Sequence, residues 1–370
     1  MPTQKPFLFP GLPLIHQPHF EESWPFAEHS IEINELARSL NRDGFAVIDF
    51  PETEFDGICD RLKQTLNPHY AWDKWNNGEQ EDLRIQDAWS FCSETKKIAV
   101  NKNIIEILGA LYGRKAFPFQ TLNFAVGTQQ LAHSDHVHFN SIPGKFMCGV
   151  WVALEDANEE NGALIYYPGS HNWLDLNNEH FAINVENQSG DDIYAHYSRY
   201  TDAWQMLAAH HQVKPKTAVL KKGQAVIWTS HVVHGGGTIL DRSRSRWSQV
   251  THYFFDNCVY TTPLANTQAL GKLLYRDVVD IANSNNVGNK ITSSELTHDE
   301  IKSASAKFCI TQDSDTCLQM HAASVYTHHK LLPDDFDALS YLKKNHDVLN
   351  AMIDPYQHYI DYGKKEGRRW

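Results

Sequence analysis

The middle of the chain carries the pattern that most restricts its fold. Between residues 117 and 257, segments rich in β-branched and aromatic residues alternate with Gly, Pro, Asn and Asp. Such segments are typical of short β-strands, and they cover residues 117–127, 147–157, 164–170, 217–230 and 246–257. Since no regular helices separate them, the pattern favours an antiparallel sandwich or barrel over a βαβ sheet.

The first third of the chain is mainly helical in pattern. Apolar residues recur at helical spacing in 32–42, which Asp43-Gly44 ends, around 54–66, and around 95–112, which closes on Gly113. A short apolar strand is expected at 45–50. Residues 1–30 contain several prolines and predict an extended arm.

Four regions follow from these patterns. They are an N-terminal arm (1–32), a strand-rich domain with helical support (33–262), a mixed helical and loop extension (263–335) and a small helical C-terminal module (336–370). The polar, aromatic stretch 172–212 is expected to form a lid or loop within the second region. One helix is expected at 270–284, and two at 336–370, on either side of Asp354-Pro355.

Composition excludes several classes of protein. The net charge is −12 and no Lys/Arg-rich block is present, which argues against nucleic acid as a partner. No stretch reaches the roughly 18 apolar residues of a membrane span, and the N-terminus lacks the basic and apolar regions of a signal peptide. The six cysteines are scattered without a CxxC pair, as expected for reduced thiols. We therefore expect a cytoplasmic protein; its oligomeric state stays open.

A metal site is suggested by the spacing His133-Ser134-Asp135. Alternate residues of an extended segment point the same way, so a HxD pair brings both side chains to one ion. The spacing alone is weak evidence, because 21 His and 45 Asp+Glu in 370 residues predict roughly 2.6 such matches by chance. The chain contains three, and those at His19/Glu21 and His298/Glu300 lie outside the strand-rich core.

Further site candidates follow about a hundred residues later. The strand AVIWTSHVVHGGG ends with His231 and His234 beside three glycines, which allow close backbone approach. Strand alternation puts the two histidines on opposite faces, and we favour His234 as the third ligand. Two histidines and a carboxylate suit non-haem iron(II). Arg246, which begins the next strand, suits a carboxylate such as that of 2-oxoglutarate; Arg242 and Arg244 are rivals.

The order of these pieces resembles the phytanoyl-CoA dioxygenase family of iron(II)/2-oxoglutarate oxygenases. The resemblance covers roughly residues 33–257. It rests on FQTLNFAVGTQQLAHSDHVHF, GVWVALEDANEENGALIYYPGSH, KKGQAVIW and the HGGG segment followed by a strand that begins with arginine. It implies a double-stranded β-helix (jelly-roll) core with helical N-terminal support. It also implies Fe(II) as the metal, with 2-oxoglutarate and O2 as co-substrates.

The resemblance assigns roles to individual residues. His133, Asp135 and His234 match the metal ligands, and Arg246 matches the 2-oxoglutarate arginine. Trp151 and Gln120 match positions beside the co-substrate. Family members often carry a hydroxyl residue two places after the distal histidine, where this chain has Gly236. A hydrogen bond to the co-substrate is then expected from Thr121 or Thr238.

We therefore expect a dioxygenase that hydroxylates a C–H bond of a small molecule and converts 2-oxoglutarate to succinate and CO2. Because Asp135 fills the carboxylate position, halogenation is disfavoured. The main alternative is a catalytically silent jelly-roll that binds or scaffolds in glycan or cell-envelope assembly. A cupin-like isomerase or a 2-oxoglutarate-independent oxygenase would not need Arg246. The tail 336–370 resembles a module of bacterial surface-polysaccharide proteins, which favours a sugar or cell-envelope precursor as substrate.

Overall fold

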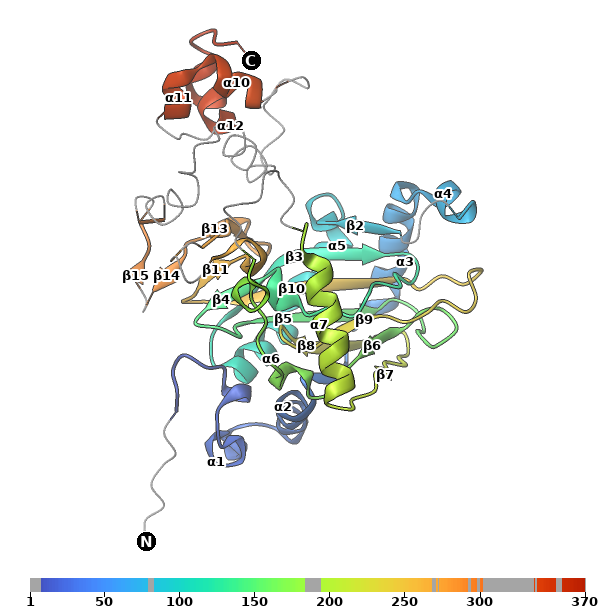
Figure 1. The fold of residues 1–370 in the computed structure, drawn as a ribbon. Helices are drawn as coiled ribbons and strands as arrows, with labels where there is room; N and C mark the ends of the chain where they lie inside the picture. Colours follow the sequence, from blue (N-terminus) through green and yellow to red (C-terminus); the bar gives the residue numbers. More distant parts are fainter. Residues whose placement is uncertain are drawn as a thin grey trace.

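The computed structural model describes residues 8–78, 83–183, 194–267, 271, 273–291, 294–297, 300–301, 336, 338–350 and 355–369. In these ranges the strand-rich middle of the chain folds into two antiparallel sheets packed against each other (Figure 1). Helices from the first third of the chain pack on the outside of the larger sheet. The double-stranded β-helix expected from the sequence is thereby confirmed.

The larger sheet has six strands and contains most of the strands expected from the sequence. All of its neighbouring strands are antiparallel. Their order is β1 (Phe45–Asp49), β8 (Gln224–Thr229), β5 (Met147–Ala153), β10 (Ser248–Phe255), β3 (Ala116–Phe124) and β2 (Arg84–Gln86). In this sheet Val250 of β10 lies opposite both Trp151 of β5 and Leu122 of β3.

The smaller sheet has three strands and closes the other side of the β-helix. Its order is β7 (Lys216–Thr217), β6 (Leu164–Tyr166) and β9 (His234–Gly236). Single bridges extend it, and one of them pairs His133 with His234. This bridge brings the two halves of the candidate metal site together, although they are about a hundred residues apart in sequence.

Alternation along the strands separates two buried layers. Val150, Val152 and Ile227 pack with the supporting helices, whereas Trp151 and Trp228 face the space between the two sheets. Side chains that differ by one position along a strand point to opposite faces. In the larger sheet, the cavity described below is therefore lined by alternate residues of a strand, such as Gln120, Leu122 and Phe124 of β3.

Helices support the outer face of the larger sheet. They are α2 (Ile31–Asp43), α3 (Phe55–Leu66), η3 (Asn67–His69), α4 (Trp72–Asn76), η4 (Ala88–Ser90), α5 (Ser93–Ala99) and α6 (Lys102–Tyr112). The helix expected at 95–112 is in fact two helices. The side chain of Asn101 accepts a hydrogen bond from the N–H of Ile104 and so begins a new helix.

The prolines of the N-terminal arm predict an extended segment, and this prediction was wrong. The described part of the arm forms three short helices instead. They are η1 (Leu14–His16), α1 (Phe20–Ser23) and η2 (Phe26–Glu28). Ile15, Phe20 and Trp24 are buried in the main core. Burial of these apolar side chains stabilises a compact arrangement that proline spacing alone does not predict.

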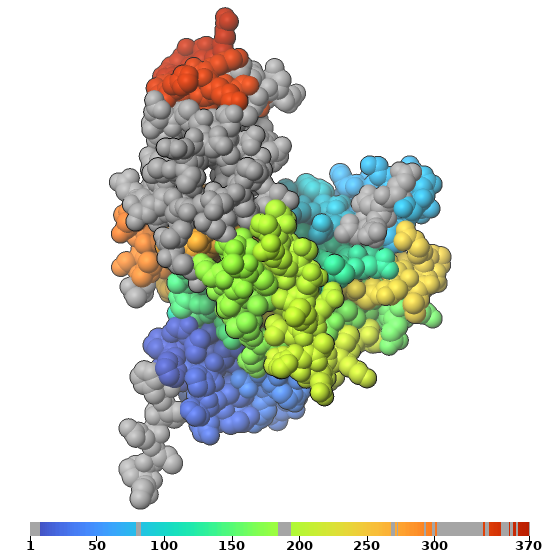
Figure 2. All heavy atoms as spheres, viewed as in Figure 1, coloured from blue at the N-terminus to red at the C-terminus, as the bar shows by residue number. Residues whose placement is uncertain are grey.

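The stretch 172–212, expected to be a lid or loop, contains a regular helix. Its described elements are η6 (Ser170–Asn172), η7 (Asn178–Phe181) and α7 (Tyr197–His210). Tyr200 and Trp204 of α7 pack with Val137 and Val233, which lie beside the candidate metal ligands. Figure 2 shows α7, in yellow-green, forming the front surface of the molecule.

The helix expected at 270–284 is absent from the described residues of that stretch, and this prediction was wrong. Residues 278–280 form β12 (Val278–Asp280), which pairs with β13 (Asn285–Val287). Asp280 stabilises the turn, since its carboxylate accepts hydrogen bonds from Ala282 N–H and the Asn283 amide. Val278 is buried in the main core, so tertiary contact overrides the helical spacing.

Other elements complete the described part of the chain. They are η5 (Asp135–Val137), β4 (Asn140–Ile142), β11 (Val259–Thr261), η9 (Pro263–Ala265), β14 (Lys290–Ile291) and β15 (Ser294–Glu295). Of the six cysteines, the four in described positions are buried and free (Cys59, Cys92, Cys148 and Cys258). Among the described helices, none has the length and apolar character that a membrane span requires.

The C-terminal module is helical, in more pieces than expected. It contains α10 (Ala338–Lys344), α11 (His346–Asn350), α12 (Pro355–His358) and the π-helical turn η12 (Tyr359–Gly363). Its own small core includes Tyr341, Leu342, Val348 and Tyr359. Tyr341 and His358 share a hydrogen bond of 2.9 Å between the phenol oxygen and Nδ1.

Candidate metal centre and co-substrate pocket

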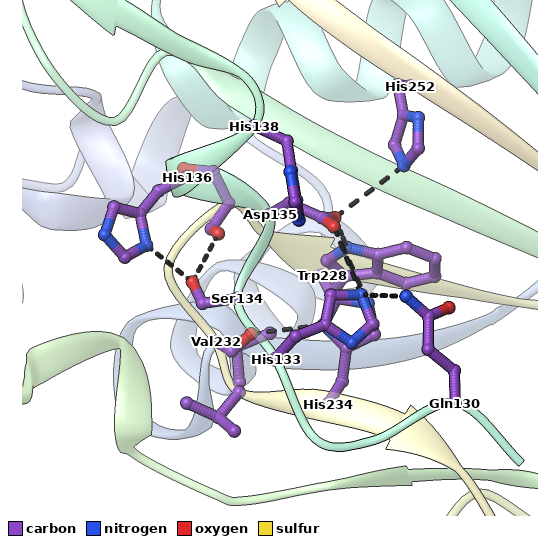
Figure 3. Close-up of polar contacts among 12 residues, drawn as sticks. Gln130, His133, Ser134, Asp135, His136, His138, Trp228, Val232, His234 and His252 are labelled. Atoms are coloured by element: carbon purple, nitrogen blue, oxygen red, sulfur yellow. Dashed lines mark hydrogen bonds and ion pairs between the residues drawn. The ribbon is translucent and has the colours of Figure 1, made fainter. Parts of the chain in front are cut away.

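Three side chains meet between the two sheets. His133 precedes η5, Asp135 begins η5 and His234 begins β9. The Nε2 atoms of His133 and His234 lie 3.7 and 3.9 Å from Oδ1 of Asp135. All three residues are buried, and their ligand atoms lie within 4.8 Å of one another. Figure 3 shows both imidazoles and the carboxylate turned toward a common point.

Backbone carbonyls fix which nitrogen of each imidazole faces that point. Nδ1 of His133 lies 2.9 Å from the Leu131 carbonyl, and Nδ1 of His234 lies 3.1 Å from the Val232 carbonyl. Because a carbonyl oxygen only accepts, Nδ1 carries the proton in both rings and Nε2 presents a lone pair. This is the arrangement commonly found for metal-binding histidines.

Electrostatics favour the metal-binding protonation states. Burial and then His234 lower the pKa of His133 to about 3, so its imidazole is neutral at neutral pH. Burial raises the pKa of the Asp135 carboxyl, but His234, His252, His133 and the Trp228 N–H together hold it well below its usual range. A neutral imidazole beside an anionic carboxylate suits a divalent cation.

The neighbouring histidines divide between two locations. His138 and His252 line the same cavity as the triad. His231 and His136 do not; their rings stack on each other with centroids 4.4 Å apart. Figure 3 shows His136 pointing away from the triad. Of the two histidines that follow β8, His234 is the one that joins His133 and Asp135.

A cavity of about 350 Å³ opens beside the triad. Of the expected co-substrate residues, Arg246, Trp151 and Gln120 line it. The guanidinium of Arg246 lies 5.3 Å from the centre of the Trp151 ring. Oε1 of Gln120 lies 2.9 Å from Nδ1 of His252, which orients that ring.

Arg246 is a buried cation whose hydrogen bonds, within the described part of the chain, go to backbone carbonyls. Its Nη1 and Nη2 donate to the carbonyls of Gly162 and Val126 at 3.3 and 3.2 Å, and its Nε has no partner among the described residues. It is 2% exposed, and burial lowers its pKa to about 10, with Glu155 opposing the shift. Buried charges are normally paired, so a carboxylate ligand would fill a gap in this site.

Arg242 and Arg244, the alternative candidates for the co-substrate arginine, make contacts outside the cavity. Arg242 donates to the Trp75 carbonyl and lies 3.9 Å from the centre of its ring. Arg244 pairs with Glu160 near the surface. Arg246 is the one of the three that lines the cavity.

Neither Thr121 nor Thr238, the two threonines expected to contact the co-substrate, lines the cavity. Thr121 lies between the cavity-lining residues Gln120 and Leu122 and so points to the opposite face, while Thr238 does not line the cavity. Thr128 does. Its Oγ1 lies 2.6 Å from where a Cβ of residue 236 would stand, so Thr128 occupies the space that Gly236 leaves.

Sequence reasoning also missed two positions around Asp135. Trp228 Nε1 donates to Oδ2 of Asp135 at 2.7 Å, and His252 Nε2 lies 3.7 Å from the same oxygen. The sequence pattern could have indicated Trp228, because it is the last inward-facing residue of the strand that leads to His234. No sequence pattern could have indicated Thr128, because it lies beside Gly236 only after segments 128–132 and 234–236 come together in the fold.

Comparison with known families agrees with this geometry. The profile of the phytanoyl-CoA dioxygenase (PhyH) family matches residues 40–246, more than half of the chain and most of the two sheets. The chain belongs to this family. The matched range begins in α2 and ends at Arg246, and thus contains the triad and the pocket arginine.

Individual relatives are distant or short. Zebrafish (Danio rerio) phytanoyl-CoA dioxygenase domain-containing protein 1 is 47% identical over 47 residues, which is 13% of this chain and 16% of that protein. The epimerase SnoN, solved with Fe3+, alpha ketoglutarate and nogalamycin RO, is 17% identical, with a TM-score of 0.49 over 73% of this chain and 97% of SnoN. EctD from S. alaskensis, solved with 2-oxoglutarate and 5-hydroxyectoine, is 16% identical, with a TM-score of 0.46 over 62% of this chain and 78% of EctD.

The buried His–Asp–His triad, which could hold a metal ion, thus lies within the part of the chain that matches the phytanoyl-CoA dioxygenase family. The chain spans about a sixth of the length of the curated relative that it matches.

Proposed function

We propose that this protein hydroxylates a C–H bond of a small polar molecule, with 2-oxoglutarate converted to succinate and CO2. The observation that carries the proposal is the unpaired, buried guanidinium of Arg246 in the same cavity as the triad. A metal-binding jelly-roll without an oxo-acid co-substrate has no use for a cation there. An iron(II) held by the triad would supply oxygen activation coupled to oxidation of the oxo-acid.

The triad residues fit iron(II) by their chemistry. Two neutral imidazoles and one carboxylate form the facial donor set of non-haem iron oxygenases. His133 and His234 present their Nε2 lone pairs because their Nδ1 protons are bound to carbonyls. Trp228 donates to Oδ2 of Asp135 and leaves Oδ1, the atom nearer both imidazoles, for the metal.

Arg246 and Thr128 are the proposed co-substrate contacts. A guanidinium pairs with a carboxylate through two parallel N–H···O bonds, and Arg246 is buried where such a pair excludes water. Thr128 Oγ1 accepts a bond from the N–H of Gln130 at 3.3 Å, which leaves its own proton for an acceptor. We propose that this hydroxyl replaces the one that family members carry two residues after the distal histidine.

The rest of the cavity supports a small, polar substrate. Arg84, Gln86, His138 and Tyr197 line it together with the aliphatic Leu122. His138 Nε2 and the Tyr197 hydroxyl lie 3.2 Å apart, so α7 contributes one wall. Alternating hydrogen-bonding and aromatic groups suit a ring with hydroxyl substituents, such as a sugar or a cell-envelope precursor.

Succinate formation tests the reaction. Protein loaded anaerobically with Fe(II) is mixed with O2, 2-oxoglutarate and a panel of sugars, amino acids and acyl derivatives. We expect substrate-stimulated succinate together with a product 16 mass units heavier than one panel member, as hydroxylation requires. Normal iron binding without succinate, with or without substrates, would overturn the enzyme proposal in favour of a silent binding protein.

Arginine variants test the co-substrate site separately. Arg246→Gln and Arg246→Lys are expected to raise the KM for 2-oxoglutarate by about 10- to 100-fold, because the bidentate pair is lost, while iron affinity stays within about twofold. Arg244→Gln, at a partly exposed arginine near by, is the matched control and should change neither value. An unchanged KM in both Arg246 variants would remove 2-oxoglutarate from this pocket.

A further inference from the structure

A second His–Asp–His cluster lies beside the segments that carry the triad. Its members are His136, His231 and Asp175, and their ligand atoms lie within 4.8 Å of one another. His136 directly follows Asp135, and His231 is three residues before His234. The same two segments therefore contribute histidines to both clusters, and Figure 3 shows His136 pointing away from the triad.

The hydrogen bonds of His136 leave one nitrogen facing oxygen atoms. Ser134 Oγ donates to the Ser230 carbonyl at 2.9 Å, so it accepts at 2.7 Å from Nδ1–H of His136. In the neutral ring Nε2 is then a lone pair. It faces Oδ1 of Asp175 at 3.0 Å and the Leu176 carbonyl at 3.2 Å, both of which are acceptors. A cation between these atoms would relieve the mismatch.

His231 is arranged in a similar way. Its Nδ1 lies 2.8 Å from Oγ of Ser230, and its Nε2 lies 3.5 Å from Oδ2 of Asp175. Both imidazoles are therefore oriented through Nδ1 by a serine hydroxyl, and both direct Nε2 toward one carboxylate. Hydrogen bonds of this kind hold and orient metal-binding histidines in proteins.

We propose that His136, His231 and Asp175 bind a divalent transition-metal cation of the zinc class, separate from the ion of the triad. Two imidazoles and one carboxylate form a borderline-soft donor set that suits Zn2+ better than Mg2+ or Ca2+. The two histidines are buried, while the Asp175 side chain is 62% exposed. The ion would enter from solvent and keep a water ligand on that side.

Two features set its affinity below that of the triad. The rings of His136 and His231 are stacked, with 13° between their planes, so one ring must turn before both lone pairs point at one ion. Lys145 interacts electrostatically with Asp175 and offsets part of its negative charge. We therefore expect the triad to fill first when metal is limiting.

Metal stoichiometry tests the proposal. Untagged full-length protein is stripped of metal and titrated with Co2+ alone, with metal content measured after dialysis and the visible absorption of Co2+ recorded. Wild type should bind two equivalents. Asp175→Ala should lose one, His234→Ala should lose the other, and the double variant should bind none. Asp202→Ala, at an exposed position of α7, is the matched control and should retain two.

Asp175→Ala decides the outcome because its side chain is exposed and its removal leaves the core intact. If Asp175→Ala and His231→Asn both bind as much Co2+ as wild type, the cluster binds no metal ion and the proposal is overturned. If wild type binds one equivalent that His234→Ala removes, the proposal is overturned as well. If Asp175→Ala removes a single equivalent that His234→Ala leaves intact, the second site stands and the triad fails instead.

Discussion

The indole of Trp228 donates a hydrogen bond of 2.7 Å to Oδ2 of Asp135, the carboxylate of the triad. The ring lies against Gly149 on the neighbouring strand β5, where an added Cβ would stand 2.3 Å from Cε2 of the indole. A glycine on one strand thus makes room for a side chain that orients a ligand on another segment.

Removing the indole N–H should weaken metal binding. Trp228→Phe keeps an aromatic ring but leaves Oδ2 of Asp135 without its donor, and loss of such a partner typically costs 10- to 100-fold in metal affinity. Anaerobic titration with Fe(II), competed with a chromogenic chelator, measures the change. Trp247→Phe, at a buried tryptophan of the outer layer, should bind as wild type does. Equal affinity in both variants would contradict an orienting role for Trp228.

Filling the space at Gly149 should displace the indole. Gly149→Ala is expected to lower the thermal midpoint by several degrees, as overpacking by one methyl group costs about 1–3 kcal/mol, and to weaken iron binding as Trp228→Phe does. Gly109→Ala is the control, because Gly109 lies within α6 and its added Cβ meets nothing closer than 3.6 Å. That change should be neutral or stabilising by up to about 1 kcal/mol. A Gly149→Ala protein as stable as wild type would refute the close fit.

Substitution of Thr128 in the cavity and of Thr121 in the outer layer should have different effects on co-substrate binding. Thr128→Val is expected to raise the KM for 2-oxoglutarate about tenfold, the effect of one hydrogen bond to a charged group. Thr121→Val should leave this KM unchanged and should not destabilise the fold, since Thr121 Oγ1 is buried without a partner among the described residues. Steady-state succinate assays and thermal melts measure both. An effect on KM at Thr121 alone would reverse the assignment.

Acid should unfold the metal-free protein through its histidines. Burial is the largest influence on four of them and lowers the pKa of His138, His171, His231 and His252 to about 4. In the unfolded chain the histidine pKa values are near 6.5. Between pH 4 and pH 6.5 the unfolded chain therefore binds more protons than the folded one. Stability is therefore fully present above about pH 6.5 and is lost as the pH falls toward 4, by at most about 1.4 kcal/mol per pH unit for each histidine.

Urea unfolding between pH 7.5 and 4.5 measures this slope. His138→Gln, in the cavity wall, should reduce the slope by the contribution of one group. His210→Gln, at an exposed position of α7, should leave it unchanged. A stability that is flat across this range would show that these imidazoles gain their protons without cost in the folded state.

The strands and the first helices were predictable because their signals are local. Alternation and turn residues mark the sheet, and helices α2 and α6 end where Gly44 and Gly113 adopt a positive φ of 74°. A helix was predicted at 270–284 because the apolar residues there have helical spacing. That prediction was wrong because Val278 packs with distant parts of the core. The coiled arm also depends on contacts with residues far away in sequence.

The site divides in the same way. His133, Asp135, His234 and Arg246 could be selected from order and spacing, since they lie between or at the start of strands that the pattern predicts. The hydroxyl of Thr128 could not, because its place beside Gly236 exists only when two segments separated by about a hundred residues meet. The second histidine cluster was likewise hidden, because Asp175 comes from a third segment.

The bridge between segments 133–136 and 230–234 has a further consequence. His133 and His234 exchange two backbone hydrogen bonds of 2.8 Å, and the N–H of His136 donates to the Ser230 carbonyl at 2.9 Å. One short ladder thus carries five of the six candidate ligands of the two clusters, all but Asp175. Occupancy of either cluster would restrain this ladder for the other, so the two ions would be thermodynamically linked without touching.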